Sequence, residues 1–212
     1  MTPSGETSAA STGRYLSATP DRLTAAQADV YASITEGPRR ATADVVPIID
    51  DDGRLLGPFA LMAIAPQLGE AVQALGAALR FHGRFGPVTR EVAILAVAAH
   101  HRCHFEWFAH EPAARTAGVT DEQLDAVREG AEPPGLDPEA AAAWRALRPM
   151  LTEGGLDDDA YAAAIGALGE EGLAELVWLH GYYSMLASAL AAFDPVLPAA
   201  ARGIFTEEGT HG

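Results

Sequence analysis

The segment from Arg90 to His110 concentrates groups that can move protons or act as nucleophiles. It holds two carboxylates, one thiol and four imidazoles, although most of its other residues are apolar. A helix repeats about every 3.6 residues, so Cys103, Glu106 and His110 are predicted to share one face. Glu91 lies twelve residues before Cys103, on the preceding apolar run. Converging carboxylates, thiol and imidazole can exchange protons, and they can also activate a thiolate.

Two roles are open to Cys103. A helix N-terminus and the adjacent His104 would favour its thiolate. Glu106, one turn further on, would raise the thiol pKa by charge repulsion. A lone buried cysteine otherwise acts as a small apolar residue. The residue pattern alone therefore leaves both a reactive and a structural cysteine possible.

The carboxylates also have two interpretations each. Glu106 and His110 are four residues apart, which fits either an ordinary helix pair worth a few tenths of a kcal/mol or a buried acid/base pair. Glu91 is either the partner of an arginine on a neighbouring helix or a second proton site. A carboxylate on an apolar helix is expected to have a raised pKa, which would suit proton transfer.

Metal and cofactor chemistry find little support in the sequence. His100 and His104 have a spacing that can bind a metal ion, but no third ligand is well placed. The chain contains no lysine, which excludes a lysine Schiff base and lysine-held pyridoxal phosphate. We therefore predict neither a metal nor a cofactor.

The spacing Glu91-x11-Cys103-x2-Glu106-x3-His110 resembles the signature Glu-x11-Cys-x2-Cys-x3-His of the carboxymuconolactone decarboxylase and alkylhydroperoxidase D superfamily. Glu106 replaces the second cysteine of the peroxidase branch. The resemblance extends from about Leu55 to about Leu197. It includes Gly57-Pro58-Phe59, Ala65-Pro66, Leu79-Arg80-Phe81 and Thr89-Arg90-Glu91 before the motif, and Ala117-Gly118-Val119-Thr120 and Leu176–Tyr183 after it.

This resemblance implies an all-helical bundle that assembles into trimers or hexamers. It also implies a proton relay through Glu91, Cys103, Glu106 and His110, with a water between side chains. The missing second cysteine favours acid/base chemistry on a small organic acid, lactone or cyclic metabolite. The alternatives are a one-cysteine hydroperoxide reductase that uses an external thiol, and a helical binding or assembly protein without activity. Candidate substrate-binding residues are Phe81, His82, His104, Trp107, Tyr182 and Tyr183, although core packing is the simpler role for the two tyrosines.

Composition limits the remaining possibilities. The 212 residues are 49% hydrophobic, enough for one sizeable core, and we expect one domain over residues 21–200 between tails at 1–20 and 201–212. A net charge of −15 argues against nucleic acid as a partner. The single cysteine cannot form an intramolecular disulfide, and no signal peptide or charge-free membrane span is evident. A cytoplasmic protein is therefore expected, with no membrane partner.

Helical periodicity and capping signals predict the secondary structure. We expect an all-α fold of about seven helices without a confident strand pair. Thr24 and Thr120 should open helices as capping boxes, and Gly118 should end one. Residues 45–49 are the only candidate strand, and residues 57–62 are predicted to be a loop. A short helix is predicted at residues 24–34, and the seven that follow cover residues 66–81, 87–99, 103–117, 121–128, 138–151, 157–168 and 170–192.

Overall fold

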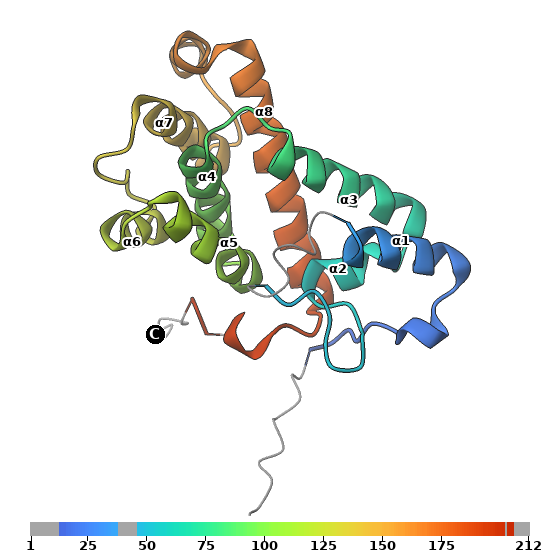
Figure 1. Ribbon diagram of the computed structural model, residues 1–212. Coiled ribbons are helices and arrows are strands. Elements are labelled where there is room, and N and C mark those ends of the chain that lie inside the picture. The colour runs from blue at the N-terminus through green and yellow to red at the C-terminus, as the bar shows by residue number, and fades with distance from the viewer. Residues whose placement is uncertain (1–12, 38–45, 202, 206–212) are drawn as a thin grey trace, which may run out of the picture.

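The computed structural model describes residues 13–37, 46–201 and 203–205, and these residues form an all-α fold (Figure 1). Within these ranges the only β-type pairings are isolated bridges, Tyr15 with Pro195 and Ile49 with Leu55. The predicted fold class is therefore confirmed. The helices are α1 (Ala25–Thr35), α2 (Gly57–Met62), α3 (Pro66–Phe81), α4 (Pro87–His100), α5 (His104–Ala117), α6 (Asp121–Glu129), α7 (Pro138–Thr152) and α8 (Asp158–Phe193), with short 3₁₀ turns at Pro20–Arg22 and Ala199–Ala201.

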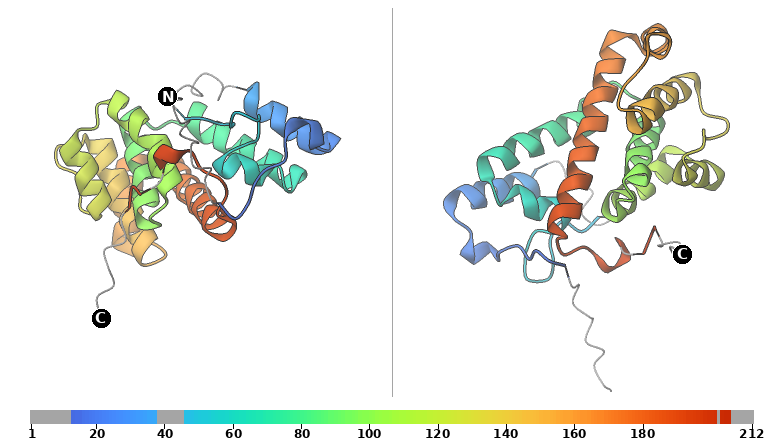
Figure 2. Two further views of the ribbon diagram at one scale, coloured as in Figure 1. Left: turned by 90° about the horizontal axis from the view of Figure 1, so that it is seen from below. Right: turned by 180° about the vertical axis from the view of Figure 1, so that it is seen from behind.

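Helices α4 and α8 form the centre of the molecule. Helix α4 packs against α5, α6, α7 and α8, while α8 also packs against α2, α3 and α7. Helix α1 lies on α3 at one side of the molecule, and α6 and α7 lie at the other (Figures 1 and 2). Residues 92–98 of α4 are all buried, which explains why this helix reads as a continuous apolar run.

Local capping chemistry sets most helix boundaries. Thr24 with Gln27, and Thr120 with Gln123, form capping boxes at the starts of α1 and α6. Gly118 ends α5 in the left-handed conformation with φ of 101°. Each side-chain cap satisfies backbone N–H groups that the first helical turn leaves without carbonyl partners. These three predicted boundaries are confirmed.

The loop predicted for residues 57–62 is wrong, because Gly57–Met62 forms helix α2. Pro58 in its first turn sets a helix-compatible φ and needs no N–H partner. Phe59 contacts Phe105 of α5 edge to face, with ring centroids 6.4 Å apart. Gly57 has φ of 55°, and a Cβ there would lie 2.6 Å from the Phe105 ring. Tertiary packing therefore stabilises a helix too short to be recognised from periodicity.

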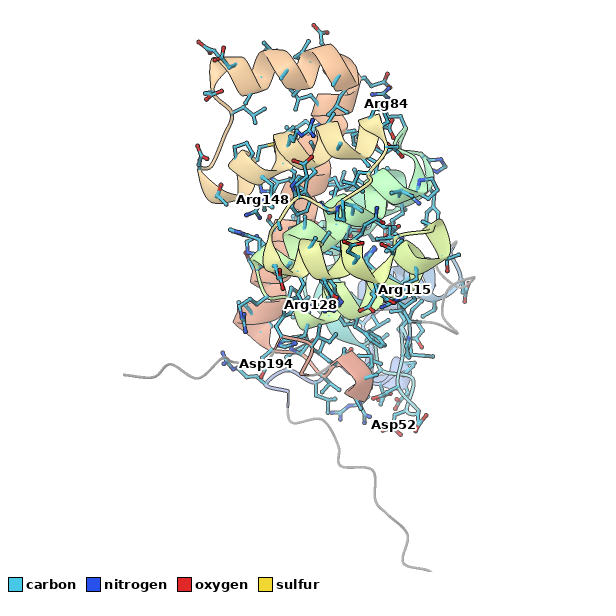
Figure 3. The ribbon with its side chains drawn as sticks, turned by 90° about the vertical axis from the view of Figure 1, so that its left-hand side faces the viewer. Asp52, Arg84, Arg115, Arg128, Arg148 and Asp194 are labelled. Atoms are coloured by element: carbon cyan, nitrogen blue, oxygen red, sulfur yellow. The ribbon has the colours of Figure 1, made fainter. Side chains whose placement is uncertain are left out.

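The two helices predicted at residues 157–168 and 170–192 meet at a break within α8. Gly169 takes an extended conformation with positive φ, at φ of 73° and ψ of 171°, which is open essentially to glycine alone. Arg84, labelled in Figure 3, lies in the loop between α3 and α4. It donates from Nη1 to the Leu168 carbonyl oxygen at 2.6 Å. Glu175 accepts from the backbone N–H of Arg84 at 2.8 Å and of Phe85 at 3.3 Å. These bonds fix the loop that leads into α4.

Helix α8 is long and apolar enough, by length and composition alone, to cross a membrane. In this fold it is instead the central helix against which α2, α3, α4 and α7 pack. Its leucines and tyrosines at helical spacing, including Leu176, Leu179, Tyr183 and Leu186, belong to the hydrophobic core. Burial of these residues accounts for part of its high hydropathy, while Val177 and Trp178 of the same helix are exposed.

The chain near both ends contacts the helical body. Of the tail predicted at residues 1–20, residues 1–12 lie outside the described part, but the backbone N–H of Arg14 donates to the Asp194 carbonyl at 2.6 Å. Phe205, in the tail predicted at 201–212, is 8% exposed and packs against the rings of His104 and Trp107. In the candidate strand at residues 45–49, Val45 is outside the described residues and Ile49 makes only its single bridge.

Candidate functional site

The α4–α5 hairpin positions the candidate relay. Gly86 N–H and the Thr89 hydroxyl at the start of α4 donate to Glu139 of α7, at 3.2 and 2.9 Å. After α4, Arg102 turns the chain with φ of 49°, and Cys103 becomes the N-cap of α5. The two helices then run back along each other, which brings Glu91 of α4 opposite α5.

Glu91, Glu106 and His110 come together in the interior, each 3% exposed. His110 Nδ1 lies 2.7 Å from Glu91 Oε2, a short hydrogen bond between the two helices. His110 Nε2 lies 3.8 Å from Glu106 Oε2, which is longer than a hydrogen bond. Both ring nitrogens of one imidazole therefore face carboxylates, and Glu91 is the closer partner. This arrangement can hold and pass a proton between two carboxylates.

The expected rise in the pKa of Glu91 is wrong. Burial on its own would raise this pKa, but the His110 imidazole and its hydrogen bond oppose burial, and Arg80 and Arg90 add positive charge nearby. Together they hold the pKa of Glu91 below its ordinary value. Arg90 Nε lies 3.3 Å from Glu91 Oε1. The expected rise rested on the apolar neighbours of Glu91 alone, although the sequence also allowed an arginine partner on a neighbouring helix, where Arg80 lies.

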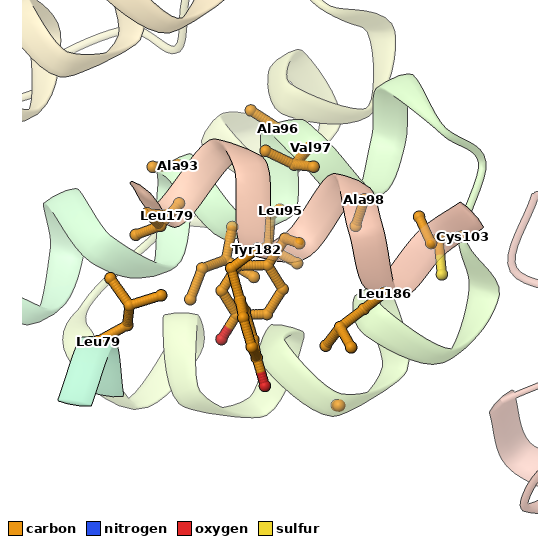
Figure 4. Close-up of a cluster of buried hydrophobic side chains, with 14 of the residues drawn as sticks. Leu79, Ala93, Leu95, Ala96, Val97, Ala98, Cys103, Leu179, Tyr182 and Leu186 are labelled. Carbon is orange, nitrogen blue, oxygen red and sulfur yellow. The ribbon is translucent and has the colours of Figure 1, made fainter. Parts of the chain in front are cut away.

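Cys103 is buried beside the relay, at 8% exposure. Figure 4 shows it alongside Ala98 and Leu186 at the edge of an apolar cluster. Burial and then the charge of Glu106 raise the pKa of the Cys103 thiol to about 12. The helix N-terminus does not compensate for this, so the thiol stays protonated at neutral pH.

A small inner cavity adjoins the relay. Its volume is about 30 Å³, and its lining includes Glu106, His110, Tyr182 and Tyr183. That volume is enough for one or two water molecules. The Tyr183 ring meets His110 edge to face at 5.1 Å, and burial raises the Tyr183 pKa well above its ordinary value. Tyr183 therefore remains a neutral phenol next to the imidazole.

A larger outer groove lies on the other side of Glu91. Its volume is about 470 Å³, and it is lined by Val46, Arg80, Pro87, Arg90, Glu91, Ala109, Pro112, Ala113, Thr116 and Ala117. Arg80, Ala109 and Val46 line both the outer groove and the inner cavity. Glu91 is thus reached from the outer groove, while His110 and Glu106 face the inner cavity.

The remaining candidate residues lie away from both cavities. Phe81 and His82 are exposed where α3 ends. The backbone N–H groups of Ile204 and Phe205 donate to His104 Nδ1, at 3.1 and 3.2 Å. Trp107 is fully buried and donates from Nε1 to Glu111 at 2.5 Å. His104 therefore fixes the C-terminal segment, and Trp107 is part of the hydrophobic core.

Two site residues were missed by the sequence reasoning. Arg80 and Arg90 flank Glu91, yet Arg80 belongs to α3 and no periodicity relates it to α4. In the sequence, both arginines were marked only by lying in segments that resemble the superfamily, Leu79-Arg80-Phe81 and Thr89-Arg90-Glu91. Among the described residues, no group of three or more His, Cys, Asp or Glu side chains is placed to hold a metal ion.

Fold and site together define an all-helical protein with a buried cluster of two carboxylates and one imidazole on a helical hairpin. Residues 66–149 match the sequence model of the Carboxymuconolactone decarboxylase family. This match over residues 66–149 supports the resemblance to the carboxymuconolactone decarboxylase and alkylhydroperoxidase D superfamily that the motif predicted. A search of curated proteins finds no match.

Solved structures share the fold at low identity. An uncharacterised peroxidase-related protein with an alkylhydroperoxidase D core, from Ralstonia eutropha JMP134, is 15% identical with a TM-score of 0.67, covering 89% of this chain and 94% of that one. The debrominase Bmp8 in complex with 2,3,4-tribromopyrrole is 16% identical with a TM-score of 0.61, covering 77% and 84%. A peroxidase-related protein from Silicibacter sp. TM1040 is 14% identical with a TM-score of 0.59, covering 71% and 81%.

Proposed function

We propose that this protein is an acid/base enzyme that decarboxylates, isomerises or enolises a small organic acid, lactone or related cyclic metabolite. The observation that carries the proposal is the buried His110 imidazole held 2.7 Å from Glu91 and facing Glu106 at 3.8 Å. The match of residues 66–149 to the Carboxymuconolactone decarboxylase family also supports an enzyme. A carboxylate that orients an imidazole and holds its proton is a common arrangement for general acid/base catalysis.

The proposed reaction needs only proton transfers by the relay. In an enolisation, Glu91, which its lowered pKa keeps ionised, takes a proton from a carbon next to a carbonyl group, and the electron pair moves to the carbonyl oxygen. In a decarboxylation, loss of CO₂ leaves the electron pair on an enolate, and a proton from the relay is added to carbon. His110 exchanges protons with Glu91 directly and with Glu106 through the inner cavity, so the carboxylate can return to its starting state.

Thiol chemistry is less well supported by the site. A one-cysteine peroxidase needs a thiolate that attacks the peroxide oxygen and an external thiol that reduces the resulting sulfenic acid. With a pKa of about 12, Cys103 would supply very little thiolate at neutral pH. Glu106, at the position of the second cysteine, adds to this effect through its charge.

Hydroperoxide turnover separates these two functions. We would measure reduction of hydrogen peroxide and tert-butyl hydroperoxide with dithiothreitol, using the full chain and Cys103→Ser. The acid/base proposal predicts a rate no higher than that of the thiol reagent alone in both proteins. Robust turnover that is lost in Cys103→Ser would replace the proposal with a one-cysteine peroxidase.

Two further expectations accompany this function. We propose that the protein acts in the cytoplasm, in keeping with a single cysteine kept as a thiol. We also propose that it assembles into a homotrimer or homohexamer. Its partner in the reaction is a small-molecule substrate, and neither a nucleic acid nor a membrane is required.

A further inference from the structure

We propose that the outer groove is the ligand-binding site and that Arg80 and Arg90 hold the carboxylate of a small, partly apolar organic acid beside Glu91. This inference rests on the proposed function and deepens it by assigning the ligand a place and a recognition chemistry. The inner cavity suits such a ligand less well, because its volume is about 30 Å³, against about 470 Å³ for the outer groove.

The two guanidinium groups approach Glu91 from different helices. Arg90 Nε lies 3.3 Å from Glu91 Oε1, and its side chain is 20% exposed. Arg80 comes from α3 and lines the same groove. Both arginines act on the charge of Glu91 and lower its pKa. The ion pair with Arg90 occupies one carboxylate oxygen, and the hydrogen bond with His110 occupies the other.

The groove therefore holds more positive than negative charge. Two arginines and one carboxylate face it, and within the described part of the chain no carboxylate lies at ion-pair distance from Arg80. This local excess is notable in a chain with a net charge of −15. Arg80 acts on the charge of Glu91 without an ion pair to it in the described residues, so its partly buried guanidinium can still bind an anionic ligand. Arginine binds carboxylates through paired N–H donors.

The other walls of the groove determine the rest of the ligand. Pro87, Ala109, Pro112, Ala113 and Ala117 supply small apolar surfaces. The Thr116 hydroxyl is already used, because it donates to the Pro112 carbonyl at 2.9 Å. The volume of about 470 Å³ lies within the range of small-molecule sites, about 300–1,000 Å³. A ligand with one charged end and an apolar ring or chain fits this lining.

This placement gives the relay a direction. A ligand in the groove meets Glu91 first, while His110, Glu106 and the inner cavity lie behind that carboxylate. Glu91 would then be the group that exchanges a proton with the ligand. His110 would position Glu91 and return it to its starting protonation state. Cys103 lines neither cavity, so it has no contact with a ligand bound in this way.

Binding can be measured without turnover, using benzoate as the probe. We would titrate the isotopically labelled full chain with benzoate at constant ionic strength and follow backbone amide signals by NMR. Saturable shifts are expected at Ala113, Thr116 and Ala117, and the uncharged analogue benzamide should bind at least about tenfold more weakly, because a charged hydrogen-bonded pair is lost. Arg80→Gln and Arg90→Gln should each weaken benzoate binding by a similar factor.

Arg145→Gln is the matched control, because it removes the same charge from an exposed side chain paired with Glu132 outside the groove. It should bind benzoate as the wild type does. If Arg80→Gln does not fold, Arg80→Lys keeps the charge and should still weaken binding, because lysine lacks the paired donors. Absent shifts in the groove, or equal binding of benzoate and benzamide, would overturn the inference. If the relay variants lose turnover but benzoate does not bind in the groove, only this ligand site is refuted. If benzoate binds in the groove but no substrate turns over, only the proposed function is refuted.

Discussion

At the scale of single residues, the tightest contact of the site joins two helices rather than two turns of one helix. The sequence spacing pairs Glu106 with His110, but their nearest atoms are 3.8 Å apart. The contact of 2.7 Å is with Glu91, nineteen residues earlier. Helical periodicity reports neighbours on one helix, and it cannot give the distance between side chains on two helices. The residues predicted that the motif side chains converge. They did not predict that Glu91 lies closer to His110 than Glu106 does.

Cys103 gives the first prediction at this scale. With a pKa of about 12 and little exposure, its thiol should react with iodoacetamide at pH 8 at least about 100-fold more slowly in the folded chain than in urea-unfolded chain. Mass spectrometry of quenched samples gives both rates, and the unfolded chain is the internal control. Equal rates in the two states would show that the thiol is accessible and ionised, which this account does not allow.

Glu91 gives a prediction about acid stability. Its pKa is lowered in the folded state, so its charged form contributes stability above the unfolded-state pKa of about 4.3, and this contribution is lost as pH falls through the lower folded-state value. The wild type should therefore lose more stability than Glu91→Gln between neutral pH and pH 3. Urea denaturation of both proteins at a series of pH values tests this. Parallel curves would mean that the carboxylate is not stabilised in the fold.

At the scale of elements, the loop between α3 and α4 is anchored at the break in α8. Arg84 binds the Leu168 carbonyl, and Glu175 binds two backbone N–H groups of the loop. Arg84→Ala should lower the free energy of unfolding by about 1–3 kcal/mol, because it removes a hydrogen bond from a charged group. Arg145→Ala, at an exposed ion pair, should cost only about 0–1 kcal/mol. Urea denaturation gives the free energy of unfolding of both variants. Equal small losses would show that the bond from Arg84 to the Leu168 carbonyl adds no stability.

How far the sequence determines the elements depends on the kind of signal. Capping boxes at Thr24 and Thr120 and the turn at Gly118 are local, so these boundaries could be predicted. Gly169 also marked the break between the two parts of α8. Helix α2 was missed because its six residues are held by contact with Phe105, far along the chain. The outer groove could not be foreseen either, since it forms only when α3, α4 and α5 meet.

At the scale of the whole molecule, several large apolar side chains remain on the surface. Leu68 is 70% exposed, Trp178 is 63% exposed and Tyr161 is 53% exposed. Tyr161, Val177 and Trp178 line one shallow depression on α8. Exposed apolar patches of this kind often mark contacts between subunits. The surface is therefore compatible with the proposed homo-oligomer.

Light scattering after size-exclusion chromatography tests the assembly. The full chain at micromolar concentration should elute as a trimer or hexamer. Trp178→Glu should shift it toward smaller species if the depression on α8 is part of the contact, whereas Arg145→Gln, at an exposed ion pair, should not. A clean monomer for the wild type would contradict the proposed assembly.

The central claim is that a proton relay, and not a thiol, carries the activity. Steady-state turnover of carboxymuconolactone, followed by a panel of small acids and lactones, would be measured for the wild type and for Glu91→Gln, Glu106→Gln, His110→Ala and Cys103→Ala, with circular dichroism to confirm folding. Loss of a positioned acid or base typically lowers the rate by about 10²- to 10⁴-fold. We predict that the first three variants each lose at least about 100-fold on the compound that turns over, and that Cys103→Ala loses less than any of them. No turnover of any compound, full activity of Glu106→Gln, or complete loss in Cys103→Ala would contradict the account.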